Sequence, residues 1–237
     1  MESRISDLLG LIFRFPAPWI LTGAGISTES GIPDFRSTDG LYNQKYDYPP
    51  ELMLSHEFFF EHTEEFYKFY RDKMLYPNVK PNKAHYALAK LESEGKLKAV
   101  ITQNIDNLHQ AAGSKNVLEL HGSVYRNYCI KCCKFYPLET VLNSTGVPRC
   151  DCGGIIKPDV VLYGEQLDEE VLDKSVSAIH TADMLIVGGT SLNVYPAAGL
   201  LHFFRGRFLV VINKTPTPAD QMAALVFNEP IGEVLGD

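Results

Sequence analysis

The sequence predicts an α/β fold: a doubly wound parallel sheet that carries a small second lobe. Short apolar runs alternate along the chain with amphipathic segments, which is typical of a parallel sheet covered by helices on both faces. Glycine-rich or polar residues follow several of these runs, where ligands bind in such sheets. The alternation is interrupted twice, once by an aromatic-rich stretch and once by a stretch that holds all five cysteines.

The predicted strands are short and apolar, and most of the predicted helices lie between them. An N-terminal helix is expected over Met1–Arg14, which is too short and too charged to span a membrane. The strands are expected at Trp19–Thr22, Lys98–Thr102, Val117–Leu120, Asp159–Leu162, Met184–Val187, Phe208–Ile212 and Ala224–Val226. The other helices are expected at Glu57–Lys73, Lys83–Glu94, Asp168–Ala182 and Pro196–Phe204.

The 237 residues are interpreted as a single domain with two lobes. The larger, Rossmann-like lobe is expected to comprise residues 1–36, 81–123 and 158–237. The smaller lobe is expected to arise from two insertions, a helical one at 37–80 and a metal-binding one at 124–157.

Composition argues against several classes of protein. A net charge of −7 is unlike that of a general nucleic-acid binder, which is usually basic. The chain shows no transmembrane run and no signal-peptide pattern, so we expect a cytoplasmic protein that binds neither nucleic acid nor a membrane. An odd number of cysteines without a signal peptide also argues against a disulfide framework.

The first strand leads into Gly23-Ala24-Gly25, a turn in which backbone N–H groups could approach an anion at the start of a helix. A dinucleotide fingerprint would need glycine at position 28, where Thr28 stands, and a plain strand-to-helix turn is the alternative. The loop that follows carries Phe35 and Arg36, which suits a lid over a cofactor.

Two further strand exits carry candidate catalytic groups. Gln103, Asn104, Ile105 and Asp106 follow one strand, either as a ligand site or as a helix cap. His121 follows the next strand, either as a structural histidine or as a general base that titrates near neutral pH. His109 competes for the role of base, but its surroundings predict a helix interior.

The cysteines form two close pairs with the spacing of a zinc ribbon. Cys129 and Cys132 are three residues apart, and Cys150 and Cys152 are two apart. Four thiolates suit a closed, tetrahedral, structural zinc site, and a redox dithiol is the alternative. Cys133 is an alternative ligand to Cys132 because the second pair is unusually tight.

Together these motifs resemble those of the sirtuins, the NAD-dependent protein-lysine deacylases, in their bacterial or archaeal form. The resemblance extends from about Trp19 to Ile231 and rests on motifs in the same order as in that family. It is carried first by Gly-Ala-Gly-Ile-Ser at 23–27 and Gly-Ile-Pro-Asp-Phe-Arg at 31–36. One mild departure is Tyr163 before Gly164-Glu165, where the family usually has phenylalanine.

The resemblance implies a role for each matching residue. His121 would be the catalytic base, Asn104 would orient a water molecule, and Asp106 would accept a hydrogen bond from nicotinamide. The residues implied to bind NAD are Gly23, Ala24, Gly25, Thr28, Phe35, Arg36, Gln103, Ile105, Asp106, His121, Thr190, Ser191, Asn213, Lys214 and Ile231. Those implied to bind the substrate peptide are Val160, Val161, Tyr163, Asn193, Val194 and Tyr195.

The implied reaction consumes NAD and an acetyl-lysine protein or peptide, and gives lysine, nicotinamide and O-acetyl-ADP-ribose. The alternatives are a mono-ADP-ribosyltransferase and a non-enzymatic NAD or ADP-ribose sensor, and we expect a monomer. Sirtuins that remove acidic acyl groups carry Tyr-x-x-Arg in the small lobe, whereas Arg71 stands four residues after Tyr67 here. Arg71 is expected to be a solvated charge that points away from the acyl pocket, so acetyl groups should be preferred to succinyl groups.

Overall fold

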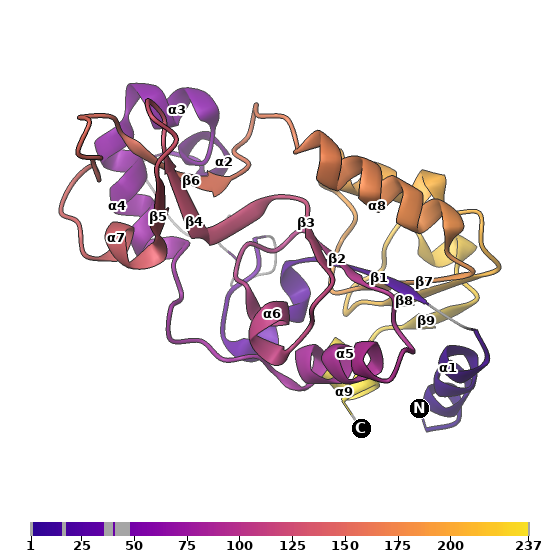
Figure 1. The fold of residues 1–237 in the computed structure, drawn as a ribbon. Helices are drawn as coiled ribbons and strands as arrows, with labels where there is room; N and C mark the ends of the chain where they lie inside the picture. The colour runs from indigo at the N-terminus through magenta and orange to yellow at the C-terminus, as the bar shows by residue number, and fades with distance from the viewer. Residues whose placement is uncertain (1, 16–17, 36–39, 41–47, 237) are drawn as a thin grey trace.

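The computed structural model describes residues 2–15, 18–35, 40 and 48–236, and two sheets organise this part of the chain (Figure 1). The larger sheet has six parallel strands in the order β3-β2-β1-β7-β8-β9. Its strands are β1 (Trp19–Thr22), β2 (Val100–Thr102), β3 (Val117–Glu119), β7 (Met184–Gly188), β8 (Phe208–Ile212) and β9 (Leu225–Phe227).

The order of the strands places a crevice beside β1. Successive strands run outward from β1 to β3 on one side and from β7 to β9 on the other, so the winding direction reverses between β1 and β7. Thr22, the last residue of β1, is level with Thr102 and with Gly188. The residues that follow these strands therefore meet at one edge of the sheet, where doubly wound folds bind their ligands.

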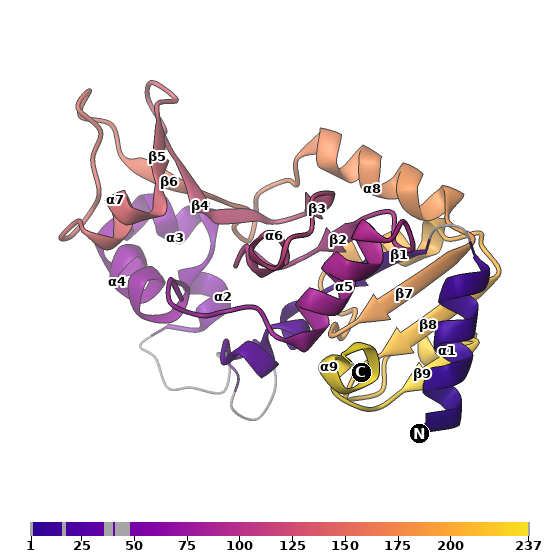
Figure 2. The same ribbon diagram turned by 60° about the horizontal axis from the view of Figure 1, so that its bottom comes forward.

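Alternate residues of the central strands supply two cores. Ile20 and Leu21 point to opposite faces, as the pleat of a strand requires. One face packs against α1 (Glu2–Arg14), α5 (Lys83–Ser93) and α9 (Ile231–Leu235). The other packs against α8 (Glu169–Thr181) and the 3-10 helix Ala197–Phe203, and Figure 2 shows these layers on either side of the sheet.

The smaller sheet is antiparallel and has an aromatic core of its own. It contains β4 (Gly122–Cys129), β5 (Phe135–Pro137) and β6 (Ile156–Val160) in the order β5-β4-β6. Four helices accompany it in Figure 1: α2 (Pro50–Met53), α3 (His56–Glu61), α4 (Thr63–Lys73) and α7 (Leu138–Leu142). Phe59 meets Phe66 edge to face with ring centroids 4.9 Å apart, a favourable aromatic geometry.

The structure corrects four of the predicted elements. The strand expected at 159–162 is β6, two to three residues earlier, and it pairs antiparallel with β4 instead of joining the parallel sheet. The helix expected over 57–73 is broken at His62, and the one expected over 196–204 is 3-10 helix. Residues 24–30 form two short 3-10 turns, so no α-helix begins directly after Gly25.

The strand β4 was absent from the prediction, and it carries the chain from one sheet to the other. It begins directly after His121, and its first residue pairs with Val160 of β6. The remaining short helix, α6 (Leu108–Ala112), lies between β2 and β3 in the sequence. The lobe boundaries given above stay a prediction, and the helices of the described residues include none long and apolar enough to cross a bilayer.

Candidate functional site

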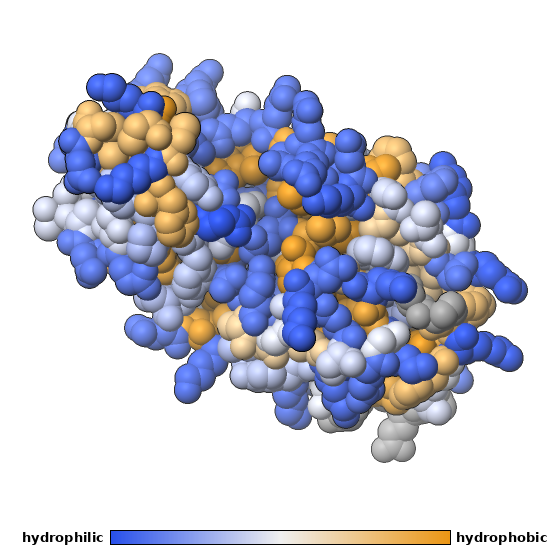
Figure 3. Space-filling view, viewed as in Figure 1, coloured by the Kyte–Doolittle hydropathy of each residue, from blue (hydrophilic) through white to orange (hydrophobic). Residues whose placement is uncertain are grey.

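A cleft of about 940 Å³ opens at the edge of the large sheet where its strands end. It is lined by residues that follow β1, β2, β3, β7 and β8, and by residues of the small sheet and its helices. Figure 3 shows apolar residues gathered in the hollow between the two parts of the molecule, on a surface that is otherwise largely hydrophilic. Every residue predicted to bind NAD or the substrate peptide lines this cleft except Arg36, which lies outside the described residues.

Two glycine-rich strand exits interlock on one side of the cleft. The N–H groups of Gly23 and Gly25 donate to the carbonyls of Gly188 and Gly189, at 3.3 and 2.8 Å. A Cβ atom on Gly25 would lie 2.8 Å from the carbonyl oxygen of Gly189, which itself has a φ of +61°. These glycines therefore allow two loops to pack against each other, which corrects the expectation that their N–H groups face an anion.

A hydrogen-bond network organises the residues that follow β2. The Oγ1 of Thr102 accepts from the Thr22 hydroxyl at 2.9 Å and from the Asn104 N–H at 3.1 Å. The Asn104 amide donates to the Ser27 hydroxyl at 3.0 Å, and Ser27 donates to Asp106 Oδ2 at 2.6 Å. Ser27 was missed as a site residue, although it ends the Gly-Ala-Gly-Ile-Ser motif.

Asp106 caps a helix and also lines the cleft. Its Oδ1 accepts the N–H of Leu108, the first residue of α6, at 2.9 Å, so it caps that helix. Its Oδ2 is held by Ser27 and lies among the residues that line the cleft. Burial raises the pKa of Asp106, although the hydrogen bonds from Ser27, Leu108 and Asn104 oppose this shift.

His121 is held in one tautomer by the backbone. Its Nδ1 lies 2.9 Å from the carbonyl oxygen of Gln103, which can only accept, so Nδ1 carries the proton and Nε2 has the free lone pair. Burial lowers the pKa of His121, so the neutral form is favoured. The competing His109 is fully buried, and its Nε2 lies 3.1 Å from the Thr22 hydroxyl. It therefore stabilises the end of β1 and does not line the cleft.

In the segment predicted to pair with a peptide, residues 160–163, three backbone N–H groups already have hydrogen-bond partners within the protein. The N–H groups of Val161, Leu162 and Tyr163 donate to the His121 carbonyl, the Glu165 carboxylate and the Leu54 carbonyl, at 2.9–3.1 Å. Backbone pairing with a peptide would therefore use other groups of this loop, which turns at Gly164 with a φ of +88°. Glu165, which had no predicted role, is held by Lys157 at 3.0 Å and His56 at 2.9 Å.

The remaining predicted residues line the far side of the cleft. Thr190 Oγ1 accepts from the Gln103 amide at 3.0 Å, which ties the β7 exit to the β2 exit. The Asn213 amide donates to the Thr215 carbonyl at 2.7 Å, leaving its side-chain oxygen as the group that can accept from a ribose hydroxyl. The other lining residues predicted here are Ser191, Asn193, Val194, Tyr195, Lys214 and Ile231.

Four cysteine thiols converge beyond the small sheet. The Sγ atoms of Cys129, Cys132, Cys150 and Cys152 all lie within 4.8 Å of one another, and Cys133 is outside this group. The Cys129–Cys152 and Cys132–Cys150 pairs are both 3.5 Å apart. Thiolates at the corners of a tetrahedron around zinc would be about 3.8 Å apart, given Zn–S bonds of about 2.3 Å. The donor set therefore fits a closed structural zinc site.

The Tyr67 and Arg71 side chains do not line the cleft. The Tyr67 hydroxyl donates to the Ile156 carbonyl in the core of the small sheet. Arg71 donates to the Val141 and Gly146 carbonyls and the Ser144 hydroxyl, at 2.6–2.9 Å. Arg71 does point away from the cleft, but the expectation of a solvated surface charge is wrong, because it ties α4 to the end of α7 and the loop beyond.

Comparisons with known proteins agree with this geometry. The model of the Sir2 family matches residues 23–196. A protein of Clostridium acetobutylicum named NAD-dependent protein deacetylase is 58% identical over 98% of this chain and 96% of its own. A protein of the same name from Thermotoga maritima is 44% identical over 97% of this chain and 95% of its own.

The solved structures that resemble this chain include Sir2 proteins. A Sir2 structure with a deacetylated p53 peptide and 3'-O-acetyl ADP ribose has a TM-score of 0.90, with 44% identity over 97% of this chain and 95% of that one. A complex of Sir2 with a p53 peptide and NAD⁺ has a TM-score of 0.86, with 44% identity over 97% and 94% of the two chains. The chain belongs to the Sir2 family.

Proposed function

We propose that this chain removes acetyl groups from protein lysines with NAD as co-substrate, and that the cleft at the strand ends is its active site. The observation that carries the proposal is the convergence of His121, Asn104 and Asp106 on one cleft at the switch point of the sheet. Relatives that align over nearly the whole chain are named for this activity, and Sir2 structures contain NAD⁺ or acetylated peptide. The activity is therefore that of an NAD-dependent protein deacetylase.

The glycine turns and the exits of β7 and β8 would hold the dinucleotide. The bound dinucleotide supplies an electrophilic anomeric carbon and nicotinamide as the leaving group. The Thr190 and Asn213 side chains and the main chain near Ile231 would contact its adenosine half, and Phe35, Ile105 and Asp106 would enclose its nicotinamide half. The amide oxygen of acetyl-lysine is a weak nucleophile. The chief contribution of such a cleft is to hold this oxygen in line with the anomeric carbon of the dinucleotide and away from water.

His121 would serve as the general base toward a ribose hydroxyl. Its Nε2 can accept a proton because Nδ1 is committed to the Gln103 carbonyl. The same hydrogen bond stabilises the imidazolium that forms, since the carbonyl oxygen faces the protonated ring. The lowered pKa of His121 favours the neutral imidazole, which is the protonation state that the reaction needs before it begins.

Asn104 and Asp106 would act on the leaving group and on water. Asp106 would accept the nicotinamide amide with a lone pair of Oδ2, and its link to Ser27 fixes the direction of that oxygen. Asn104 would use its side-chain oxygen to orient water, because its amide N–H group is directed to Ser27. The zinc ion held by the four cysteines would have no open position, so its contribution is to the fold.

The protein is further proposed to act as a monomer in the cytoplasm. Residues of a single chain bring His121, Asn104 and Asp106 together in the cleft, which supports a monomer. Reduced thiolates around zinc also suit a reducing compartment. Sedimentation of the purified protein would test the monomer, and fractionation of cells that express the native gene would test the compartment.

Peptide-dependent release of nicotinamide tests the proposed function. Purified protein is mixed with NAD and one peptide that carries either acetyl-lysine or unmodified lysine, and nicotinamide, peptide and ADP-ribose products are followed by mass spectrometry. We expect nicotinamide, deacetylated peptide and O-acetyl-ADP-ribose in equal amounts, and only with the acetylated peptide. His121→Ala should lower kcat/KM by about 10²–10⁴ while NAD binding changes only a few-fold.

The other outcomes contradict the proposal in distinct ways. ADP-ribose attached to a protein side chain, without loss of acetyl groups, would instead indicate an ADP-ribosyltransferase. NAD binding without any nicotinamide release would indicate a sensor. A His121→Ala variant with near-normal turnover would show that this histidine is structural.

A further inference from the structure

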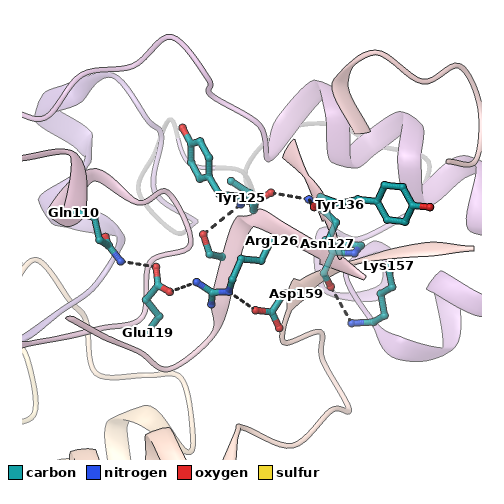
Figure 4. A network of polar contacts seen from close by, with 11 residues as sticks. Gln110, Glu119, Tyr125, Arg126, Asn127, Tyr136, Lys157 and Asp159 are labelled. Atoms are coloured by element: carbon teal, nitrogen blue, oxygen red, sulfur yellow. Dashed lines mark hydrogen bonds and ion pairs between the residues drawn. The ribbon is translucent and has the colours of Figure 1, made fainter. Parts of the chain in front are cut away.

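A charged network joins the two sheets (Figure 4). Arg126 of β4 contacts Glu119 through Nη1 at 2.6 Å and Asp159 through Nε at 2.7 Å. Glu119 ends β3 in the parallel sheet and Asp159 lies on β6 in the small sheet. Gln110 donates to the second oxygen of Glu119 at 2.8 Å, so both oxygens of that carboxylate are used.

This network spans the place where the chain passes from one sheet to the other. Glu119 precedes His121 by two residues, and Gly122 then begins β4. The pairing partner of Gly122 is Val160, directly after Asp159, and the His121 carbonyl accepts the Val161 N–H at 3.1 Å. The base and the proposed peptide-binding segment are therefore neighbours. Arg126 contacts Glu119, two residues before the base, and Asp159, directly before the segment.

The backbone of β4 is shaped to place Arg126 there. Pairing with β6 is regular at Ser123 and resumes at Asn127, so residues 124–126 form a bulge. The first bulged residue, Val124, donates its N–H to the Ile105 carbonyl in the proposed nicotinamide pocket, at 3.0 Å. Bulges next to active sites commonly redirect a side chain, and this one directs Arg126 across the joint between the sheets.

The chemistry of the contact requires arginine. A guanidinium offers donors in a rigid fork and can bind two carboxylates at once, whereas the compact ammonium of lysine cannot keep this geometry. The Glu119 side chain is 10% exposed, so its bond to Arg126 is shielded from solvent on one side. Without Arg126 the Glu119 and Asp159 carboxylates would repel each other across the joint.

We propose that Arg126 is a positioning residue that holds His121 and the 160–163 segment in register with each other. This inference rests on the proposed function, because it concerns the geometry of that same site. Arg126 acts through Glu119 on the turn that carries the base and through Asp159 on the segment that takes the peptide. Displacement of reacting groups by about 1 Å can lower a rate about 100-fold, so a loosened joint should be measurable.

Steady-state kinetics of Arg126→Gln with NAD and an acetyl-lysine peptide test the proposal, with Arg126→Lys beside it. We expect kcat/KM for the peptide to fall about 10-fold to 100-fold, with part of the loss as a raised KM for the peptide. NAD affinity should change by less than about 2-fold, and Arg126→Lys should restore only part of the activity. Simple destabilisation would instead lower kcat with the folded fraction and leave the KM for the peptide unchanged.

The matched control is Lys174→Gln, which removes an exposed ion pair with Glu170 within α8 and leaves the contacts of Arg126 with Glu119 and Asp159 in place. It should keep the kinetics of the wild type. The double variant Arg126→Gln/Glu119→Gln should be no worse than Arg126→Gln alone, because the two substitutions remove the same contact. Additive losses in that double variant would contradict action through Glu119.

A folded Arg126→Gln variant with the kcat and the KM of the wild type would overturn the inference. If Arg126→Gln does not fold, Glu119→Gln and Asp159→Asn each remove one arm of the contact. We then expect the first mainly to lower kcat and the second mainly to raise the KM for the peptide, and wild-type values in both would overturn the inference. A wild-type protein without deacetylase activity would refute the proposed function instead.

Discussion

At the scale of single residues, we expect the proposed base His121 to make the activity depend on pH. Burial lowers its pKa below the usual 6.5, and this outweighs the opposing effect of the hydrogen bond to Gln103. The neutral base therefore persists as the pH falls below 6.5, and is lost only as the pH passes through the lowered pKa. We expect the acid limb of kcat/KM to have its midpoint below pH 6.5.

A pH profile measured between pH 5 and 9, with saturating NAD and limiting acetyl-lysine peptide, would check this midpoint. Circular dichroism at each pH would verify that the protein stays folded. An acid midpoint at or above pH 6.5 would show either that His121 is not the base or that its pKa is not lowered in solution.

Arg71 and Tyr67 decide which acyl group we expect to be removed. Both side chains are hydrogen-bonded to backbone carbonyls of β6 and α7, and neither lines the cleft, so this pair is not available to a carboxylate on the acyl chain. Burying a carboxylate without a partner is costly. Turnover of an acetyl-lysine peptide should therefore exceed that of the matching succinyl-lysine peptide by at least about 10-fold.

The same two peptides can be compared with Arg71→Ala. This variant should melt at a lower temperature, because three hydrogen bonds to the end of α7 and its loop are lost, but its acetyl-to-succinyl ratio should not change. Efficient removal of succinyl groups that disappears in Arg71→Ala would contradict our assignment of Arg71 to structure.

At the scale of elements, the zinc site closes the end of the small sheet. Cys129 ends β4, and the loop with Cys150 and Cys152 precedes β6, so the metal would join segments that otherwise have a small core. Metal binding then contributes directly to folding. We expect one zinc per chain in the wild type, and loss of zinc with a lower melting temperature in Cys150→Ala.

Cys133→Ser is the matched control, since the Cys133 thiol lies outside the four-cysteine group. It should keep its zinc and its melting temperature. Elemental analysis together with thermal melting, with and without a chelator, would check both variants. Full zinc content and unchanged melting in Cys150→Ala would exclude Cys150 as a ligand.

At the scale of the whole molecule, two buried histidines link stability to pH. His85 on α5 and His109 on α6 have ring centroids 4.9 Å apart, and both are almost completely buried. Burial lowers the pKa of His85 to about 4 and that of His109 to about 3. In the unfolded chain each would have a pKa near 6.5, so below that pH the unfolded state binds protons that the folded state does not.

The free energy of unfolding should therefore fall as the pH drops from about 6.5 toward 4. Each histidine should contribute a loss of about 1 kcal/mol between pH 7.5 and pH 5.5. The variant His85→Gln should lose less stability over this interval, because glutamine does not titrate and can replace His85 in the capping box with Asn82.

Urea unfolding at several pH values measures this slope directly. His180→Gln, at an exposed position near the end of α8, is the matched control and should keep the slope of the wild type. Equal slopes for the wild type and His85→Gln would show that His85 is not buried in its neutral form.

Most of the fold could be predicted because its signals are local. Six of the seven predicted strands join the parallel sheet, and the glycines, amides and histidine that follow them line one cleft. The alternation of strands and helices implies parallel pairing, and parallel pairing brings the strand ends together. The four cysteines were also identified correctly as one group, because ligand spacing is a local property of the sequence.

What the sequence by itself determined is therefore the class of the fold, the edge of the sheet where the cleft lies, and the pairing of the cysteines into a candidate zinc site. Only the tertiary structure decided which distant groups share a contact. Residues 156–160 belong to the small sheet because they pair with β4. Glycine is needed at positions 23 and 25, after β1, because the backbone there packs against that of Gly188 and Gly189. The partners of Arg71 and Arg126 could not be predicted either. A long cationic side chain can reach carbonyls or carboxylates on other elements, and no repeating pattern in the sequence indicates which ones it contacts.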